Sequence, residues 1–224
     1  YNETATDRSV NGASYQFGLF FGTSTVTLQA VTSGTVIITT NATNSFGNSG
    51  TFVAADNITI SGITFAENIP GTNKTIEVIG DNFTLTNSKI SETNGSVYVN
   101  DFTTAEKVNK FTITNNVFDN ASTISIASGS GSSAASPATD RVITGNTFKG
   151  VSTVYARVSF SGAGGQPWYT LPVGGAVITG NTFEGENKWH IRARGDYANA
   201  QFNWKSIWEN NTFVKGSMAL KDLD

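Results

Sequence analysis

The side chains best suited to bind or react with a ligand are aromatic and basic, and most of them lie in the last third of the chain. Aromatic rings stack on the C–H faces of sugars, and the guanidinium of arginine pairs bidentately with a carboxylate or sulfate. This combination predicts a surface that binds a polysaccharide. The candidate residues are Tyr98, Tyr155, Arg157, Trp168, Tyr169, His190, Arg192, Arg194, Tyr197 and Trp204.

Short strands must present part of this set. Five segments alternate apolar and polar residues, which is the pattern of a strand with one buried face; they are 74–78, 96–100, 123–126, 153–158 and 189–194. Their inward positions are expected to be apolar throughout. The expected outward column contains Glu77, Tyr98, Asn100, Ser125, Tyr155, Arg157, His190, Arg192 and Arg194.

Loops must present the remaining candidates. Segments 161–175 and 195–205 follow two of these strands and carry the other aromatic residues, and a Ser/Gly/Ala-rich loop spans 128–140. Coils in register would stack the loops on one edge, beside the polar column. The alternative is that Trp168, Phe202 and Trp204 only pack the loops onto the wall of the fold.

Charge is distributed unevenly along the chain, whose formal net charge is −3. Residues 1–140 contain 5 Lys/Arg and 11 Asp/Glu, whereas residues 141–224 contain 9 and 6. The basic part holds all four tryptophans, which favours an acidic glycan over a neutral one; a charge that merely balances a neighbouring domain is the alternative. The negative net charge argues against nucleic-acid binding. No apolar run approaches about 18 residues, so membrane insertion is not expected.

Metal and redox chemistry have little support in the composition. The chain has no Cys and a single His, which excludes a disulfide scaffold, a thiolate zinc site and a Cys nucleophile. We expect no cofactor, with Ca²⁺ as the one ion that remains possible. Asp56 and Asp81 stand at strand entries and could bind it, although turn capping is the favoured role.

A repeated segment indicates the fold that positions these residues. A six-residue unit occurs at 60–65, 85–90, 113–118, 143–148, 178–183 and 208–213. The spacing varies while the unit keeps its length, so each repeat is a coil of constant cross-section with a loop of variable length. With the alternating strand between the units, this predicts an all-β parallel β-helix of about seven to eight coils with three short strands per coil. A β-sandwich is less favoured because it needs no repeated bend residue.

Three positions of the unit have distinct roles. The third requires a residue that tolerates positive φ; it is Gly62, Asn87, Asn115, Gly145, Gly180 and Asn210. The fourth is expected to form a ladder of hydrogen-bonded amides; in the last four units it is Asn116, Asn146, Asn181 and Asn211. The sixth is expected to be an interior apolar column; it is Phe65, Ile90, Phe118, Phe148, Phe183 and Phe213.

These repeats resemble those of the right-handed parallel β-helix proteins of the pectate-lyase-like superfamily, and the opening residues 1–4, 26–28 and 35–38 resemble the first coil of its extracellular bacterial members. The resemblance covers nearly the whole chain and implies the fold more strongly than an activity. Non-catalytic glycan binding or adhesion on a bacterial cell surface, or in a secreted protein, is the leading expectation. A polysaccharide lyase that acts on uronic-acid glycans is the alternative, and a structural stalk of a surface-layer protein is the third.

A lyase would draw its base from Arg157, Arg192 or Arg194. Few carboxylates share their column, and Glu77 lies four coils from Arg192, roughly 19 Å at about 4.8 Å per coil. That separation is too long for one calcium-assisted site, and the lyase signatures of the superfamily are not matched. We therefore expect no catalytic residue.

The rest of the sequence is simple in outline. Helical periodicity is nearly absent, and 105–108 is the only expected helical turn. Neither end shows a capping helix, so residues 1–224 are interpreted as one β-helix domain cut from a larger protein, with neighbouring domains of that chain as partners. Segments 59–61, 84–86 and 112–114 place the hydroxyls of Thr59, Ser61, Thr84, Thr86, Thr112 and Thr114 in an outward array. Such an array could order water, as in ice-binding solenoids, but it decays to Val142, Val177 and Ile207 in later repeats. A simple strand preference of threonine is the favoured reading there.

Overall fold

The structure is a computed structural model of the chain. It describes residues 2–3, 6–10, 13–40, 49–67, 74–91, 95–101, 108, 110–119, 122–128, 140–150, 153–158, 176–184, 190–194 and 203–214. Of the sequence candidates, Trp168, Tyr169 and Tyr197 lie outside these residues, as do most of the expected turn 105–108 and the loops at 161–175 and 195–202.

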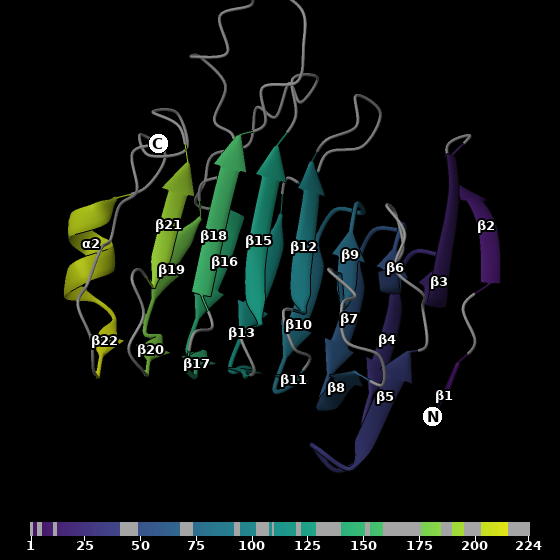
Figure 1. Cartoon of the computed structure of the whole chain (residues 1–224), viewed down its shortest axis with the longest axis horizontal. Helices are drawn as coiled ribbons and strands as arrows, with labels where there is room; N and C mark the ends of the chain where they lie inside the picture. The colour runs from purple at the N-terminus through teal and green to yellow at the C-terminus, as the bar shows by residue number, and fades with distance from the viewer. Residues whose placement is uncertain are drawn as a thin grey trace, which may run out of the picture.

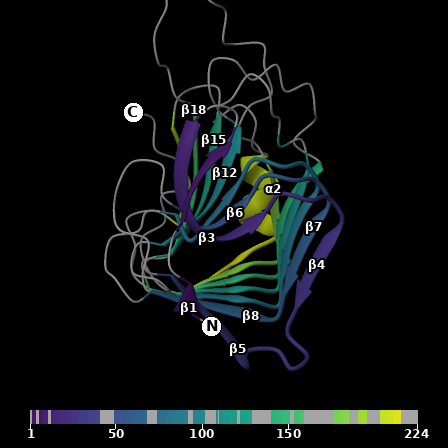
Figure 2. The same cartoon turned by 90° about the vertical axis from the view of Figure 1, so that its right-hand side faces the viewer.

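Three sheets enclose one core, and from β3 to β21 each strand is followed by a strand of a different sheet (Figures 1 and 2). Sheet A contains β1 (Asn2–Glu3), β5 (Val36–Thr40), β8 (Ile63–Glu67), β11 (Lys89–Ser91), β14 (Val117–Phe118), β17 (Thr147–Phe148), β20 (Thr182–Phe183) and β22 (Thr212–Phe213). Sheet B contains β2 (Thr6–Val10), β3 (Ala13–Phe21), β6 (Ser49–Val53), β9 (Ile76–Val78), β12 (Ser96–Asp101), β15 (Thr123–Ser128), β18 (Thr153–Val158) and β21 (Ile191–Arg194). Sheet C contains β4 (Val26–Gln29), β7 (Ile58–Ser61), β10 (Phe83–Thr86), β13 (Phe111–Thr114), β16 (Arg141–Thr144) and β19 (Val177–Thr179).

The order of strands in each sheet confirms an all-β parallel solenoid with three strands per coil. Every neighbouring pair is parallel except the hairpin of β2 and β3. The number of coils is smaller than the expected seven to eight. Sheet C has six strands, and about four turns, those that begin at β10, β13, β16 and β19, share the same tight bend and buried ladder residue.

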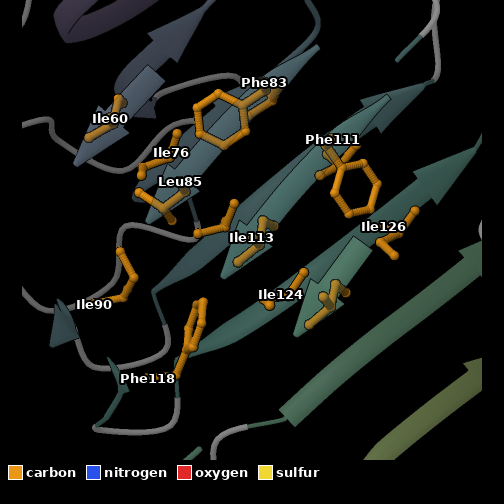
Figure 3. Close-up of a cluster of buried hydrophobic side chains, with 14 of the residues drawn as sticks. Ile60, Ile76, Phe83, Leu85, Ile90, Phe111, Ile113, Phe118, Ile124 and Ile126 are labelled. Atoms are coloured by element: carbon orange, nitrogen blue, oxygen red, sulfur yellow. The ribbon is translucent and has the colours of Figure 1, made fainter. Parts of the chain in front are cut away.

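The interior is filled by columns of stacked apolar side chains, one per inward position (Figure 3). The rings of Phe118 and Phe148 lie 4.8 Å apart, those of Phe148 and Phe183 4.7 Å apart, and those of Phe183 and Phe213 5.2 Å apart, all stacked. This confirms the predicted phenylalanine column. The inward positions of sheet B behave in the same way, because Val97, Ile124 and Val154 are fully buried in successive strands.

The bend between sheets C and A uses the left-handed backbone that the sequence predicts. Positive φ occurs at Gly62 (72°), Asn87 (51°), Asn115 (56°), Gly145 (66°) and Gly180 (66°). The prediction of positive φ is wrong at the sixth position, Asn210. Its φ is −115° because it ends a helix instead of turning between two strands.

The amides after this bend form the predicted ladder. Asn146 Nδ2 donates to Asn181 Oδ1 at 3.0 Å, and Asn116 Nδ2 donates to Asn146 Oδ1 at the same distance. Each oxygen also accepts the backbone N–H of the preceding rung at 2.9 Å, and each Nδ2 also donates to a carbonyl of sheet C. The ladder therefore satisfies polar groups that the tight turns would otherwise bury without partners.

A short helix, α2 (Trp204–Glu209), takes the place of a seventh strand of sheet C and packs against β19 (Figure 1). Asn203 caps it by accepting the N–H of Ser206 at 3.0 Å, and Ile207 is buried beneath it. The expectation that 105–108 is the only helical turn is thus wrong. The six residues are too few to show a clear helical period in the sequence. In the described part of the chain, no helix has the length and apolar character needed to cross a membrane.

Candidate functional site

The parallel pairing of sheet B brings several predicted binding residues onto neighbouring strands. Tyr98 pairs with Ser125, Ser125 pairs with Tyr155, and Tyr155 pairs with Arg192. Two residues further along the strands, Ala127 pairs with Arg157, and Arg157 pairs with Arg194. The candidates from β12, β18 and β21 therefore share two rows that run across the strands, as the alternation predicted.

The outer side of sheet B is covered at β9 and at Ser125 of β15, contrary to the expectation of an open polar column. Glu77 is 1% exposed and Ser125 is 8% exposed, although the residues beside them in the strand point into the core. Phe52, which pairs with Glu77, is also buried and stacks on Phe20 with ring centroids 6.2 Å apart. A second, small apolar cluster therefore lies outside the sheet here, and a binding surface has to be sought at β12, β18 and β21.

Lys74, Glu77 and Tyr98 form a compact charged and aromatic group at the edge of this covered region. Lys74 Nζ lies 2.8 Å from Glu77 Oε1, and the same ammonium lies 4.7 Å from the centre of the Tyr98 ring. The Lys74 side chain is 21% exposed, whereas that of Glu77 is 1% exposed. The ammonium thus neutralises a buried carboxylate and fixes the tyrosine ring through a cation–π contact. Sequence reasoning omitted Lys74, although its place three residues before Glu77 was a usable signal.

His190 does not belong to the outward column, so that expectation is wrong. It is 1% exposed, and its ring packs in the interior at 5.5 Å from the ring of Phe183 and 5.8 Å from that of Phe213. It precedes the first residue of β21, at the corner where the chain passes from sheet A to sheet B, and the equivalent Thr75 and Ser96 are buried as well. The alternation of inward and outward residues does not apply here, because a residue at the corner between two sheets can point inward even where the alternation of the strand would place it outward.

Trp204 is part of α2 and not of an open loop. Its side chain is half-buried and packs against the hydrophobic core. The packing alternative considered for this residue therefore describes it better than a sugar platform. Trp208 is 48% exposed and stacks on Phe213 with ring centroids 5.6 Å apart.

Arg141 occupies an interior position that the sequence analysis did not single out. It pairs with Phe111, which pairs with Phe83, so a guanidinium replaces a phenyl ring in an apolar column. The residue is 1% exposed, and its Nη2 donates to the carbonyl oxygen of Val108 at 2.9 Å. The alternation of residues 141–144 could have identified this inward arginine. Because it lies inside the solenoid, it does not add to the outer basic rows.

Asp56 and Asp81 act as caps between coils. Asp56 Oδ1 accepts the N–H of Asp81 at 2.7 Å, and Asp81 Oδ1 accepts the N–H of Lys110 at 2.7 Å. This is the turn-capping role that was favoured over Ca²⁺ binding. Among the described residues, no group of three or more His, Cys, Asp or Glu side chains is placed to hold a metal ion.

Comparison with known proteins does not extend this description, since no protein-family profile, curated protein or solved structure matches the chain.

Proposed function

We propose that this domain binds an acidic polysaccharide, without cleaving it, on the outer side of sheet B at β12, β18 and β21. The supporting observation is the register of β18 and β21, which sets Tyr155 next to Arg192 and Arg157 next to Arg194. Two adjacent rungs thus combine aromatic and guanidinium groups, the two chemistries that recognise an anionic sugar polymer. The proposal places the domain outside the cell, on a bacterial surface or in a secreted protein, within the pectate-lyase-like superfamily that its repeats resemble.

The geometry of a solenoid suits a polymer. Neighbouring rungs are about 4.8 Å apart, so a chain that runs across the strands meets a new set of side chains at each rung. Tyr98 lies in the same row, two rungs before Tyr155, and its ring is already held by Lys74. Binding along a row would sum several weak contacts on a surface whose backbone is fixed by the parallel pairing of β12, β15, β18 and β21, which lowers the entropic cost of association.

Lyase activity is the alternative, and binding is favoured over it. Glu77, the carboxylate expected in the outward column of sheet B, lies four strands from Arg192. Its Oε1 already pairs with Lys74 Nζ at 2.8 Å. Proton abstraction from a uronate by an arginine base needs a nearby group, such as a cation held by carboxylates, that stabilises the charge developing on the uronate. Glu77 is too distant from Arg192 to help hold such a group. A structural stalk is the third reading, and it predicts no ligand at all.

One experiment separates these readings. The full chain is incubated with a panel of uronic-acid, sulfated and neutral polysaccharides, and both co-sedimentation and the ultraviolet absorbance of unsaturated products are followed. Binding to acidic members without new absorbance supports the proposal. Rising absorbance identifies a lyase, and the absence of both signals leaves the stalk.

A further inference from the structure

We propose a second ligand-binding surface, on the outer face of sheet C, and we infer that its ligand is the surface of ice. The six strands of this sheet each carry two outward positions that align in two rows. The first row is Thr27, Thr59, Thr84, Thr112, Val142 and Val177; the second is Gln29, Ser61, Thr86, Thr114, Thr144 and Thr179.

The second row keeps its hydroxyl groups after the first has changed to valine. Ser61, Thr86, Thr114, Thr144 and Thr179 supply one hydroxyl on each of five consecutive strands. The expected decay of the array is therefore confined to the first row, where Val142 and Val177 replace threonine. Since valine has the shape of threonine with a methyl group in place of the hydroxyl, the first row keeps its surface relief to the end of the sheet.

These hydroxyl groups are free to meet a ligand. Their residues are half-buried on the outer face, and no hydrogen bond between described residues uses the hydroxyls of the threonines from Thr59 to Thr179 in the two rows. Branching at Cβ restricts χ1, so each hydroxyl and methyl group has few alternative positions. The array is therefore ordered before any ligand arrives, which reduces the entropy lost on binding.

The spacing of the array is held from inside the solenoid. The amides of Asn116, Asn146 and Asn181 donate to the carbonyl oxygens of Leu85, Ile113 and Ile143, which belong to β10, β13 and β16. These three strands of sheet C are thus each tied to the following coil by a hydrogen bond of 2.9 Å. Figure 2 shows this sheet on the side of β7 and β4, with the other two sheets closing the remaining sides.

The composition of the face selects among ligands. Threonine, serine, glutamine and valine fill every position of the two rows, so the rows contain neither a charge nor an aromatic ring. The charged residues Lys110 and Asp140 stand beside the first row, two residues before Thr112 and Val142. Within the rows, an anionic polymer would find no cation, and a sugar would find no ring on which to stack. With anionic polymers and stacked sugars disfavoured, the ligand that suits the rows is neutral and has a regular lattice of hydrogen-bonding groups. The rows lie about 6.6 Å apart along the strand, with about 4.8 Å between rungs, and such a regular array of hydroxyl groups could order water into an ice-like layer.

The experiment uses the whole chain in a frozen-droplet assay of thermal hysteresis, together with its partition into a slowly growing ice crystal. We expect a measurable hysteresis gap and enrichment in the ice. Thr114→Lys, in the middle of the second row, should abolish most of both signals. Thr147→Lys is the matched control, because Thr147 is also an outward, half-buried threonine of a β-strand, in sheet A.

Folding is monitored by circular dichroism and thermal melting of each variant. Thr114→Val keeps the shape of the site and removes only the hydroxyl group, so it tests the inference even if Thr114→Lys fails to fold. We expect this variant to lose part of the thermal hysteresis. A wild-type chain that is excluded from ice like an inert protein would overturn the inference, as would full activity in a folded Thr114→Lys variant. Retention of the wild-type chain on a crystalline neutral polysaccharide in place of ice would also overturn it. Arg192 belongs to sheet B, so its replacement should leave the thermal hysteresis and the enrichment in ice unchanged. The two binding proposals can therefore fail independently of each other.

Discussion

Asn146 and Asn181 occupy the same position in successive coils, and Asn181 Oδ1 accepts two hydrogen bonds from Asn146, one from the backbone N–H at 2.9 Å and one from Nδ2 at 3.0 Å. Both residues are 1% exposed. The amide thus replaces backbone partners that the bend between sheets C and A removes. Through this arrangement the coils keep one register, and the register in turn aligns the residues of both proposed binding surfaces.

Replacement of Asn146 by Ala tests this role. The N–H of Asn116 and the carbonyl oxygen of Ile113 would both lose a buried partner, at a cost of about 1–3 kcal/mol for each group. We expect the free energy of unfolding, measured by chemical denaturation, to fall by at least about 2 kcal/mol. Asn203→Ala, which removes an exposed helix cap, is the control with a smaller expected loss of about 1 kcal/mol. Equal losses in the two variants would mean that the ladder does not stabilise the coils.

Phe148 lies in the middle of the stacked column, fully buried between Phe118 and Phe183. Phe148→Ala should lower the free energy of unfolding by roughly 3–5 kcal/mol, because it opens a cavity that the two neighbouring rings cannot approach each other to fill. Phe213→Ala, at the half-exposed end of the column, should cost clearly less. A loss below about 1 kcal/mol at Phe148 would contradict a close-packed interior.

Gly145 has a φ of 66°, and a Cβ there would overlap the side-chain oxygen of Asn115. Gly150 has a φ of 58°, and a Cβ there would meet open space. Gly150→Ala therefore measures the backbone strain alone, about 1–2 kcal/mol, and Gly145→Ala should cost more because Asn115 must also move.

Gly145→Val should be the most destabilising substitution at this bend, since branching at Cβ adds crowding to the strain. Asparagine tolerates this backbone at Asn87 and Asn115, so Gly145→Asn should cost less than Val. It is not as mild as the repeat alone suggests, because the contact with Asn115 remains. Thermal melting of the variants orders them, and equal melting temperatures for Val and Asn would contradict a left-handed bend.

Trp204 is expected to affect stability and not ligand binding. Trp204→Ala should lower the free energy of unfolding by about 1–3 kcal/mol, since its half-buried ring packs on the core. Trp208→Ala removes a more exposed ring of the same helix and serves as the control. A large loss of glycan affinity in a Trp204→Ala variant of normal stability would restore the residue to the binding surface.

The fold followed from the sequence because its rules are local and repeated. A bend that needs positive φ, an amide after it and an aromatic ring two residues later recur with little change, so Gly145, Asn146 and Phe148 revealed their roles by position. Exceptions to the repeat were harder to predict. His190 lies at a corner where alternation between two faces no longer applies, and α2 replaces a strand over only six residues.

The candidate site was predictable in part, for a related reason. Strand register follows from the repeat, and it placed Tyr155 beside Arg192 correctly. The burial of Glu77 depends on contacts outside the sheet, with Lys74 and the cluster of Phe20 and Phe52, and such contacts leave no period in the sequence. Alternation distinguishes the two faces of a strand but does not show whether the outer face is covered.

The affinity of the wild-type chain and of an Arg157→Gln/Arg194→Gln double variant for a polyuronate, measured by calorimetric titration at low and at high salt, tests the proposed binding surface most directly. Lys149→Gln/Lys205→Gln, which removes two exposed charges elsewhere, is the control for net charge. We predict that the arginine variant loses most of the low-salt affinity while the lysine variant keeps it, and that the difference shrinks at high salt as the charges are screened. Equal low-salt affinities for the arginine variant and the wild type would contradict the binding of an acidic glycan at β18 and β21.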